Sequence, residues 1–192
     1  MGGRRPYQLG KRQATVDETK RRIIDAAITE YADHGIDGTS MLAVARRADV
    51  APGTVLYHFP DPDSLADVVI AGLYERYAAP SVESIPGDEP LSVRIASLVR
   101  ELYGVYERTS VAYRIYQKSA DHPAMKRANA EWERVVGEML LRALGEKAAD
   151  REDLQLVSVM INPGFRGTLI MSGFDSERAV EVATQLALKW LE

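Results

Sequence analysis

The sequence predicts an all-α protein of about nine helices, and three observations support this fold class. Apolar residues recur at steps of three and four along most of the 192 residues, as on one face of a helix. No segment alternates polar and apolar residues convincingly enough for a half-buried strand. Helix start and stop signals also punctuate the chain, among them Pro52 and Pro62 at first helical positions and Gly35 after a last turn.

The expected helices follow one another along the chain with few interruptions. The first spans about residues 17–33, where an isoleucine-rich apolar stripe precedes the stop at His34 and Gly35. Two short helices follow and end near Arg47 and His58. Asp61 then caps a helix over about 62–77. A loop rich in proline precedes the remaining helices, which are expected at about 91–108, 110–120, 123–145, 151–171 and 176–191.

The composition is that of an ordinary globular protein, and it excludes several classes. Hydrophobic residues make up 46% and charged residues 27% of the chain, which argues against disorder. Cysteine is absent, so a disulfide scaffold, a cysteine nucleophile and thiolate metal sites are excluded. No signal peptide and no continuous apolar membrane span is found. We therefore expect a cytoplasmic protein, without a membrane association, a metal or a cofactor.

Charge is distributed unevenly along the chain. The formal net charge is −4, which by itself argues against a nucleic-acid ligand. Residues 1–22 nevertheless carry seven basic and two acidic side chains, whereas residues 61–192 carry fifteen basic and twenty-one acidic ones. A basic front on an acidic body is expected when one part of a protein meets an anion. Charge alone leaves a solvated basic tail equally open.

Residues 38–59 carry the most informative pattern. Two short helices joined by about three residues are the geometry of a helix-turn-helix, whose second helix lies in the major groove of DNA. Hydroxyls at the start of the first helix suit a phosphate, a narrow start of the second helix can approach base edges, and polar tips at its end reach the groove wall. These three groups are Thr39 and Ser40; Ala51, Pro52, Gly53 and Thr54; and Tyr57 and His58.

Over about residues 19–65 the sequence resembles the tetracycline-repressor (TetR) family of transcriptional regulators. The run of helix, glycine, Thr-Ser helix start, ARRADV turn, GTV and final HF follows the family pattern in order. The resemblance implies a regulator that binds a near-palindromic operator as a homodimer and is released by a small-molecule effector. It implies that Thr39, Ser40, Tyr57 and His58 hold phosphates, while residues 51–54 lie against the bases. The implied domains are a basic flexible arm over 1–15, a helix-turn-helix domain over 16–61 and an effector-binding and dimerisation domain over 62–192.

Three residues depart from the family pattern. Asp49 stands where the family usually has glycine, and aspartate tolerates the left-handed backbone of the turn. Leu56 replaces a common tyrosine, and Pro62 replaces a common lysine that would hold a phosphate. We therefore expect operator affinity to depend on the basic arm, with Arg4, Arg5, Lys11 and Arg12 as its contact residues.

The last two expected helices predict a dimer interface. The final helix carries one apolar stripe at helical spacing, and the helix before it is apolar on most sides. A monomeric core could explain either helix alone, but both together favour a four-helix interface between two copies. The expected interface residues are Leu156, Met160, Leu169, Val180, Ala183, Leu186, Ala187 and Trp190.

Aromatic and adaptable apolar side chains of the helices after residue 90 predict the effector site. The candidates are Tyr103, Tyr106, Tyr113, Tyr116, Trp132, Met139, Asn162, Phe165 and Arg166. Any single one of them could equally be a core residue. Asn162 and Arg166 are the better indicators, because polar groups on an apolar helix need partners. Arg166 could face an anionic ligand or a carboxylate across the dimer.

Two other functions remain as alternatives. An enzyme is disfavoured, because His34, His58 and His122 lie far apart and no nucleotide-binding, metal-binding or nucleophile motif occurs. The acidic residues Asp150, Glu152 and Asp153 are explained by helix capping. The second alternative is a helical ligand-binding or partner-binding protein with weak DNA affinity, which Leu56 and Pro62 make conceivable.

Overall fold

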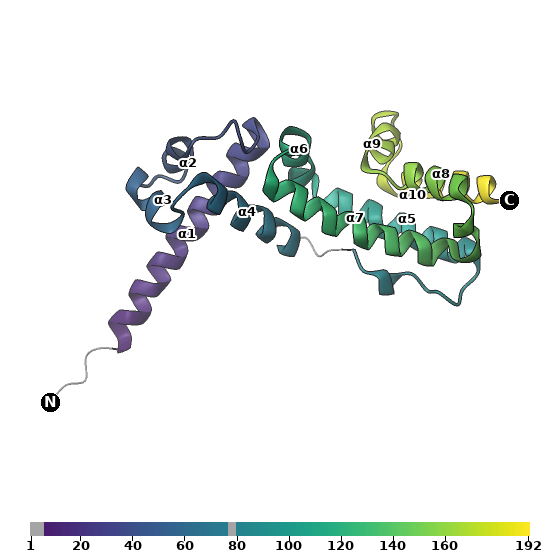
Figure 1. Ribbon diagram of the computed structural model, residues 1–192, viewed down its shortest axis with the longest axis horizontal. Coiled ribbons are helices and arrows are strands. Elements are labelled where there is room, and N and C mark those ends of the chain that lie inside the picture. The colour runs from purple at the N-terminus through teal and green to yellow at the C-terminus, as the bar shows by residue number, and fades with distance from the viewer. Residues whose placement is uncertain (1–5, 77–79) are drawn as a thin grey trace. The chain divides into compact units, whose positions relative to one another are not determined.

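The computed structural model describes the backbone of residues 6–76 and 80–192, and the side chains of residue 14 and of 16–74 and 80–192 (Figure 1). Within these ranges every regular element is a helix, which confirms the all-α prediction. The α-helices are α1 (Pro6–His34), α2 (Met41–Arg47), α3 (Pro52–His58), α4 (Pro62–Arg76), α5 (Leu91–Arg108), α6 (Ser110–Ser119), α7 (Pro123–Leu144), α8 (Arg151–Met160), α9 (Pro163–Met171) and α10 (Ser176–Leu191). Two short 3-10 helices, Val82–Ser84 and Gly145–Ala149, lie between them.

The chain forms two compact units. The N-terminal unit comprises residues 1–74 and 111–128, and the C-terminal unit comprises residues 75–110 and 129–192. The N-terminal unit therefore extends past the boundary expected at residue 61, because α4 buries its apolar side Leu65, Val69 and Leu73 completely or nearly so. Within the same unit, Asp67 of α4 forms an ion pair with Arg127 of α7. A helix this apolar must be buried over a broad face.

Helix α1 begins eleven residues earlier than the sequence led us to expect. Residues 6–15 form its first turns, so the expectation of a flexible arm over that stretch is wrong. Pro6 suits the first helical position, and the residues after it, Gly10 apart, are tolerated or favoured in helices. Of the expected arm residues, Arg4 and Arg5 lie outside the described residues, as do the side chains of Lys11 and Arg12.

In the N-terminal unit, α6 holds the end of α1. The backbone N–H of Ile36 donates to the buried Ser119 hydroxyl at 2.8 Å, and Lys118 donates to the carbonyls of Ala32 and Asp33 at 3.1 and 2.5 Å. Gly35 has φ +77° and a Cβ there would lie 3.1 Å from the Lys118 carbonyl oxygen, so glycine is required on both grounds. These bonds fix the loop that leads into α2.

The turn between α2 and α3 depends on two residues. Asp49 adopts φ 53°, the left-handed conformation expected at this position. Arg22 of α1 donates to the Ala48 carbonyl and, at 2.9 Å, to the Asp49 carbonyl. One of the seven basic residues of the N-terminal front is therefore used to hold the turn.

The substitution Asp49→Val should destabilise the protein by about 1–2 kcal/mol, because a β-branched residue is strained at positive φ. Asp49→Gly is the control: it relieves this strain and should change the free energy of unfolding by no more than about 0.5 kcal/mol. Urea unfolding followed by circular dichroism measures both. Equal stability of the two variants would show that the turn is not constrained as described.

The core of the C-terminal unit is built mainly from α5 and α10. Helix α5 contributes large side chains such as Ile95, Leu98 and Leu102, all fully buried. Helix α10 faces it with Ala183 and Ala187, which are also fully buried. Small residues on one helix let the larger side chains of the other interdigitate at close range.

The helix expected over 151–171 is two helices, α8 and α9. Asn162 between them is extended (φ −71°, ψ 144°), and its side chain accepts the backbone N–H of Gly164 at 2.8 Å. Pro163 lacks an N–H and disfavours a helical residue before it, so the helix stops and restarts rather than bending. The acidic residues that begin α8 act as expected for a cap, since Asp150 accepts the N–H groups of Glu152 and Asp153.

Candidate nucleic-acid interface

A buried seam sets the orientation of α3. Val44 and Ala45 of α2 and Val55 of α3 are at most 1% exposed, and the Val50 N–H donates to the Ala45 carbonyl across the turn at 3.1 Å. Four residues, 48–51, join the two helices, close to the three expected. Because one side of α3 is packed into this seam, its other side is presented to solvent.

The outward side of α3 carries the residues expected to meet bases. Ala51, Pro52 and Gly53 are exposed, whereas Thr54 and His58 are half-buried. Tyr57 is 79% exposed, and its ring meets that of His58 edge-on at 5.3 Å. A Cβ on Gly53 would meet nothing within 4 Å, so folding of this chain does not require glycine there.

The two hydroxyls expected to bind phosphate differ in whether the hydroxyl proton is already donated within the chain. The Thr39 hydroxyl donates its proton to the Gly35 carbonyl at 2.7 Å, so it is committed within the chain. The exposed Ser40 hydroxyl accepts the Ala43 N–H at 3.1 Å and thereby caps α2. Its own proton remains available to a phosphate oxygen.

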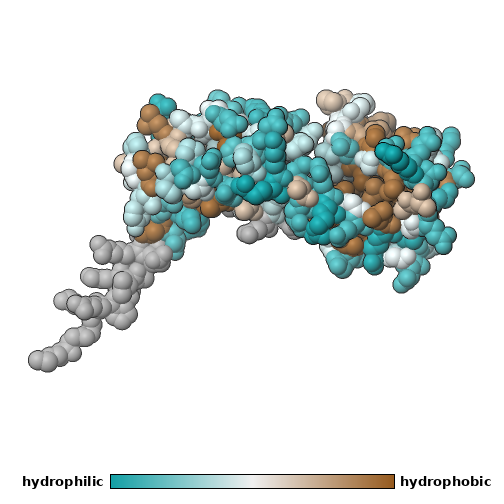
Figure 2. All heavy atoms as spheres, viewed as in Figure 1, coloured by the Kyte–Doolittle hydropathy of each residue, from teal (hydrophilic) through white to brown (hydrophobic). Residues whose placement is uncertain are grey.

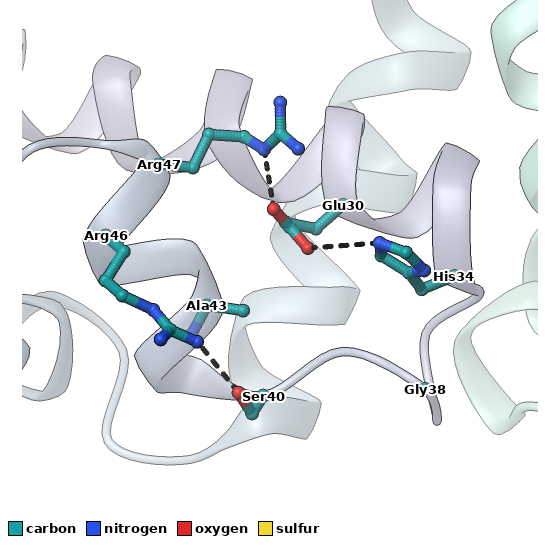
Figure 3. Close-up of a pocket in the computed structure, with 7 residues that line it drawn as sticks. All are labelled: Glu30, His34, Gly38, Ser40, Ala43, Arg46 and Arg47. Carbon is teal, nitrogen blue, oxygen red and sulfur yellow. Dashed lines mark hydrogen bonds and ion pairs between the residues drawn. The ribbon is translucent and has the colours of Figure 1, made fainter.

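An open hollow beside Ser40 brings together residues of α1 and α2 (Figure 3). On its floor, Glu30 is only 8% exposed and accepts a bond from Arg47 Nε at 2.6 Å, while His34 Nε2 lies 3.8 Å from the other carboxylate oxygen. The bond to Glu30 raises the pKa of Arg47. Arg47 is thus used internally, whereas Arg46 lines the hollow as an exposed side chain.

Arg46 is the cation that sequence reasoning missed. It lies one turn after Leu42 on the exposed side of α2 and lines the same hollow as Ser40. The sequence signal that indicates its exposure is helical spacing. Residues 42 and 46 are four apart and share one side of α2, opposite the side of buried Val44. Ser40 and Arg46 together give the edge of the α2–α3 unit a hydroxyl donor and a positive charge.

The aromatic residues expected to line an effector site fall into two groups. In the C-terminal unit, the Tyr106 ring lies 6.4 Å from Tyr103 and 5.8 Å from Trp132, and Phe165 packs on the same core. Tyr103 is itself core: it is 1% exposed, donates to the Met160 carbonyl at 2.7 Å, and burial raises its pKa. Met139 is fully buried as well, so Tyr106, Trp132 and Phe165 are the members with exposed surface.

The other expected effector residues are placed differently. Tyr113 and Tyr116 stack on each other at 6.3 Å and belong to α6 in the N-terminal unit. Asn162 is exposed and caps α9, so it is not a buried polar group that lacks a hydrogen-bond partner.

Arg166 has its carboxylate partner in its own chain. Its Nη2 lies 3.6 Å from Glu107 and 3.2 Å from the Ser176 hydroxyl, which itself donates to Glu107 at 3.1 Å. Only 15% of the Arg166 side chain is exposed. Glu107 thus gives the guanidinium a carboxylate inside this chain, whereas the sequence suggested an anionic ligand or a carboxylate across the dimer.

The expected dimer residues divide by burial. Ala183, Ala187 and Leu169 are at most 8% exposed and pack in the chain's own core, so their assignment to an interface is wrong. Leu156, Met160 and Val180 are half-buried, while Leu186 and Trp190 remain 43% and 44% exposed. The structure adds Val159 and Met171, at 55% and 83%. Figure 2 shows apolar surface gathered on the face of the C-terminal unit turned to the viewer.

Comparison with known proteins decides the family. A family model described as bacterial regulatory proteins, tetR family, matches residues 23–69. The solved structure of a TetR-family member from Streptomyces coelicolor A3 is 30% identical, with a TM-score of 0.60, over 88% of this chain and 98% of that one. The chain belongs to the TetR family.

Further relatives agree with membership of the TetR family. The multidrug binding protein EbrR, solved in complex with ethidium, is 28% identical with a TM-score of 0.55, over 88% of this chain and 98% of that one. The HTH-type transcriptional regulator UidR of Escherichia coli (strain K12) is 24% identical over 111 residues. That alignment spans 58% of this chain and 57% of UidR, less than two thirds of the curated relative's length.

The departures from the TetR-family pattern now have structural counterparts. Pro62 occupies the first position of α4, where Asp61 caps the helix by accepting the Ser64 N–H at 2.7 Å. Leu56 is 51% exposed on the outward side of α3. In the described parts of the chain no cluster of metal-binding side chains occurs, and none of the helices there is long and apolar enough to cross a membrane.

Proposed function

We propose that this chain is a ligand-responsive transcriptional repressor that binds a near-palindromic double-stranded DNA operator as a homodimer and acts in the cytoplasm. The observation that carries the proposal is the buried seam of Val44, Ala45 and Val55, which presents the far side of α3 to solvent. This is the arrangement by which a helix-turn-helix inserts its second helix in the major groove. An enzymatic role is not part of the proposal, since the relatives are named transcriptional regulators.

Polar groups around α3 support a DNA ligand. Ser40 and Arg46 lie at the edge of the α2–α3 unit, and Tyr57 projects from α3 with 79% of its surface exposed. Hydroxyls and guanidinium groups at such positions bind phosphate oxygens and fix the orientation of the helix on the duplex. Basic residues 4–12 add positive charge close to this unit along the chain.

The apolar surface of the C-terminal unit supports a homodimer. Leu186, Trp190 and Val159 each leave about half of their surface uncovered within one chain. A two-fold axis through this surface would pair α10 with its copy and present two α3 helices to one operator. In such dimers the half-sites lie about 34–36 Å apart, one turn of DNA.

The half-buried aromatic side chains of the C-terminal unit support a small-molecule effector of aromatic or apolar character. Tyr106 and Trp132 lie 5.8 Å apart between ring centres and, with Phe165, keep part of their surface exposed. Such surfaces bind flat apolar molecules by stacking and burial. The EbrR structure with ethidium shows a relative holding an aromatic molecule. We infer that effector binding shifts α4, so that the two α3 helices lose the spacing of the operator.

A salt titration tests the DNA-binding part of this proposal. The wild-type protein is titrated against labelled DNA from upstream of its own gene, and binding is followed by fluorescence anisotropy across a range of salt concentrations. The logarithm of the binding constant should fall linearly with the logarithm of salt, by about 0.9 for each phosphate contacted. A shuffled duplex of the same composition should bind at least about a thousandfold more weakly at physiological salt.

Deletion of residues 2–12 shows how many of these phosphate contacts the N-terminal segment makes. The slope should become shallower, because fewer counterions are released. A flat slope for the intact chain together with equal binding of both duplexes would refute the proposal. It would favour a helical ligand-binding or partner-binding protein with weak DNA affinity.

A further inference from the structure

The outward side of α3 lacks the groups that proteins commonly use to read guanine, adenine and cytosine. Its exposed residues are Pro52, Gly53, Leu56 and Tyr57. None of them carries an amide, a guanidinium, an ammonium or a carboxylate. The two arginines of α2 lie elsewhere: Arg46 lines the hollow beside Ser40, and Arg47 is bound to Glu30.

Base chemistry limits what such a surface can recognise in the major groove. Guanine is read by arginine or lysine, adenine by asparagine or glutamine, and cytosine by a carboxylate. Thymine alone carries a methyl group in the groove, which apolar side chains contact. The hydroxyls of Thr54 and Tyr57 both donate and accept, so they fit several bases and discriminate weakly.

Leu56 is the side chain on this surface best suited to the methyl group. It is 51% exposed, so its apolar side chain is accessible to a methyl group of the DNA. Its inward neighbour Val55 is fully buried and makes the contacts that the seam needs. Beside it, a Cβ on Gly53 would lie in open space, so the backbone of α3 can approach the base edges closely.

We propose that α3 reads its operator through thymine methyl groups and that Leu56 is the residue that determines this specificity. This inference rests on the proposed DNA-binding function and adds to it the chemistry of the sequence read. The operator half-sites should therefore carry thymine, on one strand or the other, at the positions that face Leu56.

Replacement of thymidine by deoxyuridine, which lacks only the methyl group, tests the inference. A high-affinity duplex is first selected by the wild-type protein from a pool of random-sequence duplexes, and each thymidine is then replaced in turn. Loss of a methyl that contacts Leu56 should weaken binding about fourfold in one half-site, from the transfer free energy of one carbon group. Replacement in both half-sites should weaken it about fifteenfold, since distant sites add.

Two leucine variants with matched exposure give the control. Leu56→Ala should bind the thymidine duplex more weakly than the wild type does. This variant should bind the thymidine and deoxyuridine duplexes with equal affinity, because the contact to the methyl group is already gone. Leu42→Ala removes a leucine that is also 51% exposed, but on α2, and it should retain the wild-type preference for thymidine. Both substitutions are on the surface, so thermal unfolding midpoints should match that of the wild type.

The outcomes separate this inference from the function on which it rests. Selective, salt-dependent binding with no difference between thymidine and deoxyuridine would overturn the methyl readout and leave the DNA-binding function standing. A thymidine preference that survives in Leu56→Ala would overturn the role of Leu56. Failure to select any duplex would overturn both proposals.

Discussion

Leu186→Glu is expected to convert the protein to a monomer and to weaken operator binding by a factor of about 10²–10⁴. Leu186 is 43% exposed on α10, so glutamate is hydrated in a single chain and the fold should be retained. At the proposed interface the same carboxylate would be buried without a partner, which costs several kcal/mol. The large loss of DNA affinity follows because two linked half-site contacts become two independent weak ones.

Leu141→Glu is the matched control for the dimer prediction. Leu141 is 52% exposed on α7 of the same unit, so the variant carries the same charge change at a similarly exposed leucine. Light scattering coupled to gel filtration gives the mass of each variant, and anisotropy gives its affinity for the operator. A dimeric Leu186→Glu protein, or a monomeric Leu141→Glu protein, would show that the interface does not lie where we propose it.

Gly53→Ala is expected to have opposite effects on folding and on DNA binding. Alanine is favoured over glycine in helices, and its Cβ would meet nothing within 4 Å in this chain, so stability should rise by about 0.5–1 kcal/mol. The same methyl would stand between the α3 backbone and the base edges. Overpacking of a close contact costs about 1–3 kcal/mol, which corresponds to about a tenfold to hundredfold loss of operator affinity.

Gly72→Ala provides the comparison for this substitution. Gly72 is an exposed residue of α4, and a Cβ there also meets nothing within 4 Å. The variant should gain stability by a similar amount and keep the wild-type affinity for the operator. Unfolding in urea and anisotropy titration measure the two effects. If Gly53→Ala bound DNA as tightly as Gly72→Ala, the close approach of α3 to the bases would be ruled out.

Local sequence signals determined most of the helical framework. The bounds of α5 and α10 and the ends of α2 and α3 agree with expectation to within a residue, because caps and apolar spacing act over three or four residues. The left-handed turn at Asp49 was predictable for the same reason. Signals failed where the local pattern was ambiguous: the basic start of α1 was expected to be a flexible arm, and one helix was expected over 151–171, across the break at Pro163.

Tertiary packing decided which residues of each helix are available to a partner. The apolar stripe of α10 was visible in the sequence, but it is wider than the part that the core covers. Only the position of α5 decides that Ala183 and Ala187 are buried while Leu186 and Trp190 stay exposed. Likewise, the sequence showed that Arg166 needs a partner, and packing of α5 and α10 around α9 supplied Glu107. Helix formation is set by neighbours along the chain, whereas burial and pairing are set by residues distant in sequence, which no local pattern encodes.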